Sequence, residues 1–176
     1  MRALSTKKVI TTFLVSTLAL TLTSCSGAGP DAATRMIKKV TDGAEATVTT
    51  DGSDLRISNL LLVATADGSA VVVGHIVNRA GTPDQILGIT AGGIEATITG
   101  ETKLLTNKPI HFEGDSANAK AVFAGVNAEA GKNVDVTIGF ARAGLVTVHA
   151  IIRDQRDVYA GITSGAKLAT PAATTK

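Results

Sequence analysis

Cysteine is almost absent from this chain, and its scarcity limits what can hold a fold together. Cys25 is the only cysteine among 176 residues, so no disulfide can form within the chain. Tryptophan is absent, Met and Tyr number two and one, and aromatic residues make up 3%. The core must therefore come from Val, Ile, Leu and Ala, and the β-branched members of that set favour strands.

The chain also lacks an excess of charge of one sign. It has 17 Lys and Arg residues against 15 Asp and Glu, and three of the basic residues, Arg2, Lys7 and Lys8, lie near the N-terminus. Beyond residue 24 the balance is 14 basic to 15 acidic residues. This balance lacks the basic excess of a nucleic-acid-binding domain, and no nucleic-acid partner is expected.

The longest apolar run is too short to span a membrane as a helix. Val9–Leu22 has 14 residues, whereas a spanning helix needs roughly 20. It follows basic residues and leads into Leu22-Thr23-Ser24-Cys25, a lipobox, in the layout of a secretory signal peptide. We expect diacylglycerol on the Cys25 thiol and cleavage just before it. The acyl chains would anchor the protein at the outer, extracytoplasmic face of the cell membrane.

Composition divides the chain into four parts. Residues 1–24 are the expected signal peptide, and the Ser-, Gly- and Pro-containing residues 25–34 are an expected flexible tether. Residues 35–162 are expected to form one β-domain, beginning with one possible helical turn over 35–40. Residues 163–176 have no apolar period and are an expected disordered tail.

Short apolar runs separated by Gly, Asn and Asp predict an all-β domain. Ala66-Asp67-Gly68 is the clearest hairpin turn, because Asp-Gly supplies a positive φ. Strands at this spacing indicate a β-sandwich, with the charges of Arg56, Lys103 and Lys120 helping to protect its edges. The expected strands are 45–50, 55–64, 69–78, 85–90, 94–99, 109–112, 120–126, 133–140 and 145–152.

Two segments carry a family resemblance. Val77–Ile89 has a strand, a polar turn, an Asp and an aliphatic-Gly-aliphatic strand, and Asn133–Val148 contains Phe-Ala-Arg-Ala-Gly before a Val-rich strand. Over roughly residues 55–152 the chain resembles the periplasmic copper chaperones of the PCuAC type. The resemblance implies a cupredoxin-like Greek-key β-sandwich. With its lipobox, the chain is more narrowly similar to the LpqE-type lipoproteins of actinobacteria, which implies association with the respiratory cytochrome bcc–aa3 supercomplex.

The copper ligands of the PCuAC family are not matched. That family holds Cu(I) with two His and two Met, and the positions of one His-x-Met pair carry Lys120 and Val122 here. The other expected His falls near Ala96 or Thr97. Met36 is the only Met beyond residue 24 and lies outside the matched region. The resemblance therefore implies that the family's copper site is missing, and no cofactor is expected.

Three histidines leave an alternative open. His75 is expected to be a half-buried residue on the strand face of Val71, Val73 and Val77, and His111 and His149 to be ordinary strand residues. A metal site would need two or three of them to converge with a carboxylate. Their convergence would make the chain a copper-binding chaperone that delivers copper to cytochrome oxidase through a rearranged histidine site.

No catalytic motif is found in the sequence. There is no strand-to-helix Gly-x-Ser-x-Gly elbow, and a non-enzymatic protein is expected. Arg153, Arg156 and Tyr159 are candidates for a partner contact, because Arg and Tyr are favoured at interfaces. The preferred interpretation is a membrane-anchored lipoprotein that binds a protein partner. Copper delivery and a structural envelope role are the alternatives.

Overall fold

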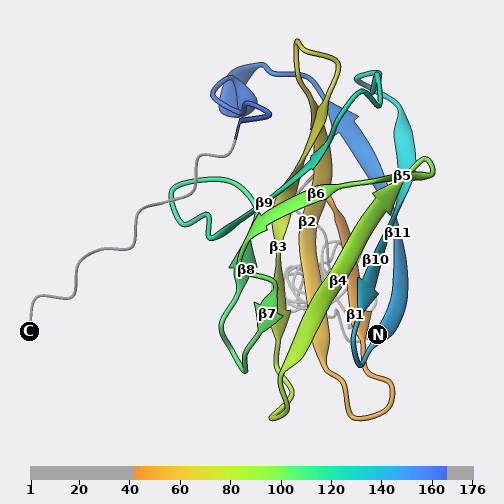
Figure 1. Cartoon of the computed structure of the whole chain (residues 1–176), viewed down its shortest axis with the longest axis vertical. Coiled ribbons are helices and arrows are strands. Elements are labelled where there is room, and N and C mark those ends of the chain that lie inside the picture. Colours follow the sequence, from red (N-terminus) through yellow and green to blue (C-terminus); the bar gives the residue numbers. More distant parts are fainter. Residues whose placement is uncertain (1–41, 166–176) are drawn as a thin grey trace, which may run out of the picture. The chain divides into compact units, whose positions relative to one another are not determined.

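The computed structural model describes residues 42–165, and its regular secondary structure is almost entirely β-strand (Figure 1). A 3-10 helix, η2 (Asp157–Tyr159), follows the last strand. The all-β prediction is confirmed. The strands are β1 (Ala44–Val48), β2 (Leu55–Ala64), β3 (Ala70–Asn78), β4 (Asp84–Ala91), β5 (Ile94–Glu95), β6 (Thr97–Gly100), β7 (Lys103–Leu104), β8 (Ile110–His111), β9 (Ala119–Phe123), β10 (Asn133–Phe140) and β11 (Gly144–Arg153).

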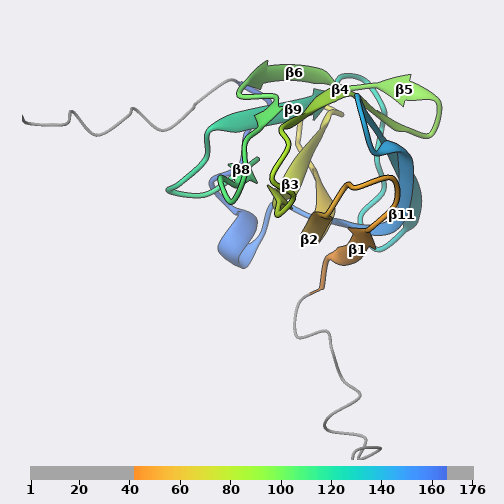
Figure 2. The ribbon, with the colours of Figure 1, turned by 90° about the horizontal axis from the view of Figure 1, so that it is seen from below.

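The strands join into one curved sheet in the order β5-β4-β10-β11-β2-β3-β9-β6. Strand β1 pairs with β2, β7 with β4, and β8 with β3. The strand pairings are antiparallel except that of β11 with β2, which is parallel and involves Ile152 and Arg153. One half of this path is β5, β4, β10 and β11, and the other is β2, β3, β9 and β6. The chain crosses between the halves from β3 to β4, from β5 to β6 and from β9 to β10, and the short strands β7 and β8 join opposite halves. As Figure 2 shows, the strands curve round a shared interior.

Short apolar runs, either at period two or nearly continuous, predicted most strands closely. β2 and β10 have the predicted limits, 55–64 and 133–140. The predicted strand 94–99 is wrong as a single element, because β5 pairs with β4 whereas β6 pairs with β9. The chain moves from one end of the sheet path to the other at Ala96. β7 and η2 were not predicted, since elements of two or three residues have no periodicity to detect.

The hairpin between β2 and β3 turns at the predicted Asp-Gly. Thr65 N–H donates to Ser69 O at 2.9 Å, Gly68 N–H donates to Thr65 O at 3.0 Å, and Gly68 has φ 78°. This is a three-residue loop with Gly in the left-handed region. A hydrogen bond from the Ser164 hydroxyl, then one from Thr65, holds the pKa of the Asp67 carboxyl well below its usual range.

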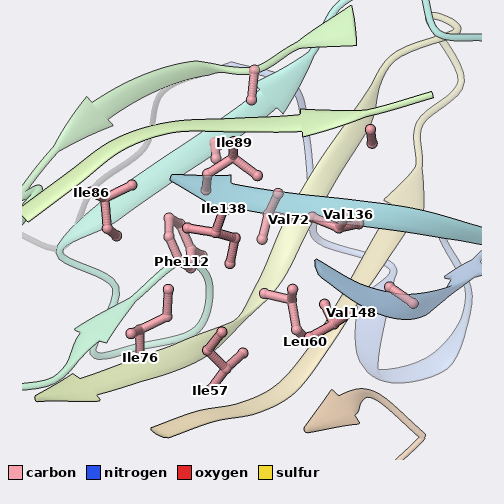
Figure 3. Packing of buried hydrophobic residues seen from close by; sticks show 14 of the residues in the cluster. Ile57, Leu60, Val72, Ile76, Ile86, Ile89, Phe112, Val136, Ile138 and Val148 are labelled. Atoms are coloured by element: carbon pink, nitrogen blue, oxygen red, sulfur yellow. The ribbon is translucent and has the colours of Figure 1, made fainter. Parts of the chain in front are cut away.

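The interior of the curved sheet is apolar. Along β10, Val136, Ile138 and Phe140 are buried and alternate with residues that are half-buried or exposed. Phe112 and Phe123 are the largest fully buried side chains. Residues from both halves meet in this core, as Figure 3 shows. Each large aliphatic side chain buried there contributes about 1.5–3 kcal/mol, so the core can stabilise the domain without a disulfide.

A bulge in β2 depends on two glycines. Asn59 has φ 52° and interrupts the register of β2 with β3, and its Oδ1 accepts a hydrogen bond from Gly43 N–H at 3.0 Å. A Cβ on Gly43 would lie 2.2 Å from the Asn59 carbonyl carbon, and a Cβ on Gly74 would lie 2.8 Å from the Asn59 oxygen. Only residues without a Cβ allow the backbones to approach this closely.

Two of the charges expected at sheet edges lie elsewhere. Arg56 is in β2, paired on both sides by β1 and β3. Lys120 lies in β9 between β3 and β6, and is 2% exposed. The edge-protection prediction is wrong for both residues. Lys103 is exposed on β7, a strand that pairs with β4.

Several predictions lie outside the described residues. These are the signal peptide of residues 1–24, Cys25 and its lipid, the tether of residues 25–34, and the helical turn over 35–40. The predicted tail from residue 163 falls largely outside them as well. Among residues 42–165, no helix is both long and apolar enough to cross a membrane.

Candidate functional site

The positions that the resemblance assigns to copper ligands lie side by side on β6 and β9. Thr97 is directly opposite Val122, and Thr99 is directly opposite Lys120. The two segments are far apart in sequence, and the pairing of β6 with β9 brings them together. These positions carry a hydroxyl, an isopropyl group and an ammonium here, none of which is a usual Cu(I) ligand.

The Lys120 ammonium has a specific partner. Its Nζ lies 2.6 Å from Glu113 Oε1, and the two side chains are 3% and 15% exposed. Removing one charge from such a buried pair would leave the other uncompensated, at a cost of about 3–5 kcal/mol. The ion pair therefore holds the Lys120 side chain in one place. We call Thr97, Lys120 and Val122 together the β6–β9 position.

The structure brings two of the three histidines together. His75 of β3 is directly opposite His111 of β8, and their ring centres lie 5.4 Å apart with the planes at 37°. Both side chains are half-buried, as predicted for His75. Their proximity depends on the pairing of β8 with β3, and the spacing of 36 residues gives no hint of it.

The environment of His75 lowers its pKa. Burial is the largest cause, followed by repulsion from His111 and Arg56, and the carboxylate of Glu45 acts in the opposite direction. Arg56 Nη2 lies 3.5 Å from Glu45 Oε2, and its Nε donates to Ser58 Oγ at 3.3 Å. The imidazole of His75 is therefore neutral at neutral pH, the form that binds metal ions.

His149 lies elsewhere, on β11. Its Nδ1 is 2.8 Å from Oδ1 of Asp135, the residue directly opposite on β10, and both side chains are more than half exposed. His149 therefore does not converge with the other two histidines, and His75 and His111 are the two that adjoin. In the described part of the chain, no group of three or more His, Cys, Asp or Glu side chains is placed to hold a metal ion.

Two of the three predicted contact residues line one polar cavity. Arg153 and Arg156 contribute to a hollow of about 450 Å³ beyond the end of β11, together with Asp154 and Asp157. Arg156 Nε donates to Asp154 Oδ2 at 2.6 Å, which holds the pKa of Asp154 below its usual range. Tyr159 packs instead against a small apolar cluster under η2.

An exposed apolar patch was not predicted. Leu87 of β4 is 65% exposed and Leu145 of β11 is 80% exposed. Both flank Gly139 of β10, since a Cβ built there would lie 3.5 Å from Leu145 Cδ2 and 4.0 Å from Leu87 Cβ. Alternation could have indicated that each leucine points outward. Their adjacency required the register of β10 with its two neighbours.

An apolar groove lies at one end of the domain, between the β4–β5 turn and the segment that joins β9 to β10. It has a volume of about 410 Å³. Its apolar lining includes Leu62, Val126 and Ile152, and the charged Glu129 and Lys132 also line it. Sequence periodicity did not predict this groove, because its lining comes from segments far apart along the chain.

The architecture is a cupredoxin-like β-fold. Among solved structures, an apo PCuAC domain from PmoF1 is similar at 24% identity and a TM-score of 0.52, covering 62% of this chain and 98% of that domain. A copper-bound PCuAC domain from PmoF2 is 19% identical with a TM-score of 0.52, covering 62% and 97%. No family model and no curated protein matches the chain. The similarity establishes the PCuAC-like fold predicted from sequence.

Proposed function

We propose that this chain is a non-enzymatic binding domain, anchored by lipid on Cys25 at the extracytoplasmic face of the cell membrane, and that it binds a membrane protein complex. The observation that carries the proposal is that the β6–β9 position holds no usual Cu(I) ligand. On a fold shared with copper-binding domains, Thr97 and Val122 face each other there. Beside them, Lys120 is held by Glu113. The scaffold thus serves binding through its surface.

Two surfaces are suited to a protein partner. Leu87 and Leu145 give an exposed apolar patch on β4, β10 and β11, and exposed apolar side chains that adjoin are typical of interaction sites. Arg153 and Arg156 supply charged groups at the far end of β11, and Arg is enriched among residues that dominate interfaces. β11 contributes to both surfaces.

The proposed partner is the respiratory cytochrome bcc–aa3 supercomplex, in which the chain would be an accessory subunit. Support for this partner comes from the resemblance of the lipobox and scaffold to LpqE-type lipoproteins. Affinity purification of the oxidase from membranes in mild detergent should recover the chain, and Leu145→Asp should reduce recovery at least tenfold. The Asp115→Asn variant, altered on an exposed loop, is the matched control. Failure to recover the wild-type chain from membranes that contain it would overturn the proposal.

Copper handling is a second candidate function, favoured by the adjacency of His75 and His111. In this case the chain would deliver copper to cytochrome oxidase through imidazole ligands, which suit copper. Deleting the chain should then lower the copper content of purified oxidase, and added copper should restore it. Unchanged copper content in cells grown at limiting copper would exclude this function.

A further inference from the structure

Two imidazoles share one face at the junction of β3 and β8. His75 and His111 are directly opposite in an antiparallel pair, an arrangement in which the Cβ atoms start about 4.5–5.5 Å apart. The ring centres are 5.4 Å apart. Both side chains are half-buried, so that each is partly reached by solvent and partly fixed by its neighbours.

We propose that His75 and His111 form a two-imidazole binding site for a divalent transition-metal ion of the Cu²⁺, Ni²⁺ and Zn²⁺ class. Metal–nitrogen bonds to His are about 2.0–2.1 Å, so two imidazoles bound at a tetrahedral angle have ring centres about 5 Å apart. The observed 5.4 Å agrees with this spacing. Imidazole nitrogen suits these ions, and Cu²⁺ should bind most tightly.

An ion pair and a hydroxyl lie close to the histidine pair. On β2 the residue opposite His75 is Ser58, which supplies a neutral hydroxyl. Arg56 Nη2 lies 3.5 Å from Glu45 Oε2, and Arg56 Nε donates to Ser58 Oγ at 3.3 Å. A bound ion would complete its coordination with water, or with the Glu45 carboxylate if its ion pair with Arg56 broke.

This site is separate from the β6–β9 position. Val71 of β3 is the residue opposite Val122, and His75 lies four residues further along the strand, which is about 13 Å at 3.3 Å per residue. The physiological role of the site rests on the copper-handling function proposed above. Metal binding by the two imidazoles can be tested independently of that role.

The test uses the full chain carrying Cys25→Ser, so that no thiol competes, with an affinity tag that contains no histidine. The protein, purified in mild detergent, is titrated with CuSO₄ at neutral pH and followed by calorimetry and electron paramagnetic resonance. His75→Gln and His111→Gln are compared with His149→Gln, which removes the remaining imidazole of the chain. Circular dichroism checks that each variant is folded, and a Ni²⁺-induced rise in Tm, lost in the same variants, is the second readout.

We expect one Cu²⁺ per chain with hyperfine coupling to two nitrogens. His75→Gln and His111→Gln should each weaken binding at least tenfold, and His149→Gln should change it less than twofold. No binding to the parent chain, unchanged binding in the first two variants, or equal loss in His149→Gln would each overturn the site. If copper binds at the pair but oxidase copper content does not depend on the chain, the site stands and copper delivery fails. If the pair binds no Cu²⁺ in the titration but oxidase copper content depends on the chain, delivery stands and the site fails.

Discussion

The carboxylate of Asp84 is predicted to be a main determinant of domain stability. It begins β4 and is 5% exposed. Its Oδ1 accepts hydrogen bonds from the backbone N–H groups of Gln85 at 2.8 Å and Arg142 at 2.9 Å, and its Oδ2 accepts one from Ala143 at 3.1 Å. Because residues 141–143 form the turn between β10 and β11, this one side chain fastens a hairpin 58 residues away.

Asp84→Ala removes the acceptor for three N–H groups. A hydrogen bond to a charged group contributes about 1.5–3 kcal/mol, but some turn donors regain water after truncation, so we expect a total loss of about 3 kcal/mol. In a domain of this size that loss lowers Tm by roughly 10 °C. Asp84→Asn keeps one carbonyl oxygen but turns an NH₂ group toward a backbone N–H, and should cost about 1–2 kcal/mol.

Urea unfolding followed by far-ultraviolet circular dichroism measures these losses. Asp135→Asn is the matched control. The Asp135 side chain is 72% exposed, and the residue opposite it on β11 is His149, to which it is paired. The control should stay within about 0.5 kcal/mol of wild type, as surface substitutions usually do. If Asp84→Ala also stays within that range, the buried carboxylate does not fasten the hairpin and the reasoning is refuted.

Three further substitutions test other parts of the fold. Gly74→Ala should destabilise by about 3 kcal/mol in thermal unfolding, because its Cβ would lie 2.8 Å from a backbone oxygen of β2 at a φ of 135°. Glu113→Ala should cost about 3–5 kcal/mol in urea unfolding by leaving Lys120 buried without its partner, whereas Glu113→Gln with Lys120→Met should recover most of the loss. The hydrogen bond from Ser164 depresses the folded-state pKa of Asp67 below its usual 3.8. Its stabilising effect should therefore be complete above pH of about 4 and fall as the pH is lowered further, and Asp67→Asn should reduce that acid dependence.

The first two of these substitutions each have a matched control. Gly81→Ala introduces a Cβ into open space at a residue without positive φ, and should be nearly neutral. Lys132→Ala breaks the exposed pair with Glu129 and should change stability by less than about 1 kcal/mol. Equal losses in Gly74→Ala and Gly81→Ala would contradict the close approach at the β2 bulge. A Glu113→Ala loss as small as that of Lys132→Ala would show that Lys120 does not need its partner.

Strand positions were readable from the sequence because apolar runs, alternating in β10 and nearly continuous in β2, are bounded by turn residues. β2 and β10 have their predicted limits, and Gly68 has the positive φ that Asp-Gly predicted. Pairing between distant segments was not readable. The approach of His75 to His111 needs β8 beside β3, and no local pattern specifies that neighbour.

The candidate site was likewise predictable from the sequence only in part. The resemblance selected Thr97, Lys120 and Val122 as positions to compare, and the β6–β9 register places them together. The burial of Lys120 was missed, because a Lys in a strand is normally exposed and its partner Glu113 lies in a loop. The outward direction of Leu87 follows from alternation, but its position beside Gly139, which Leu145 also flanks, follows only from the three-strand register.

Site-specific photo-crosslinking in intact membranes tests the central claim most directly. A photoreactive residue replaces Leu145, which is 80% exposed, and in a parallel strain replaces Asp115, exposed on the loop after β8. We predict an adduct between position 145 and a subunit of the cytochrome bcc–aa3 supercomplex, with little or none from position 115. No adduct at position 145, or the same adduct from both positions, would contradict a lipid-anchored domain that binds this complex through the β4–β10–β11 face.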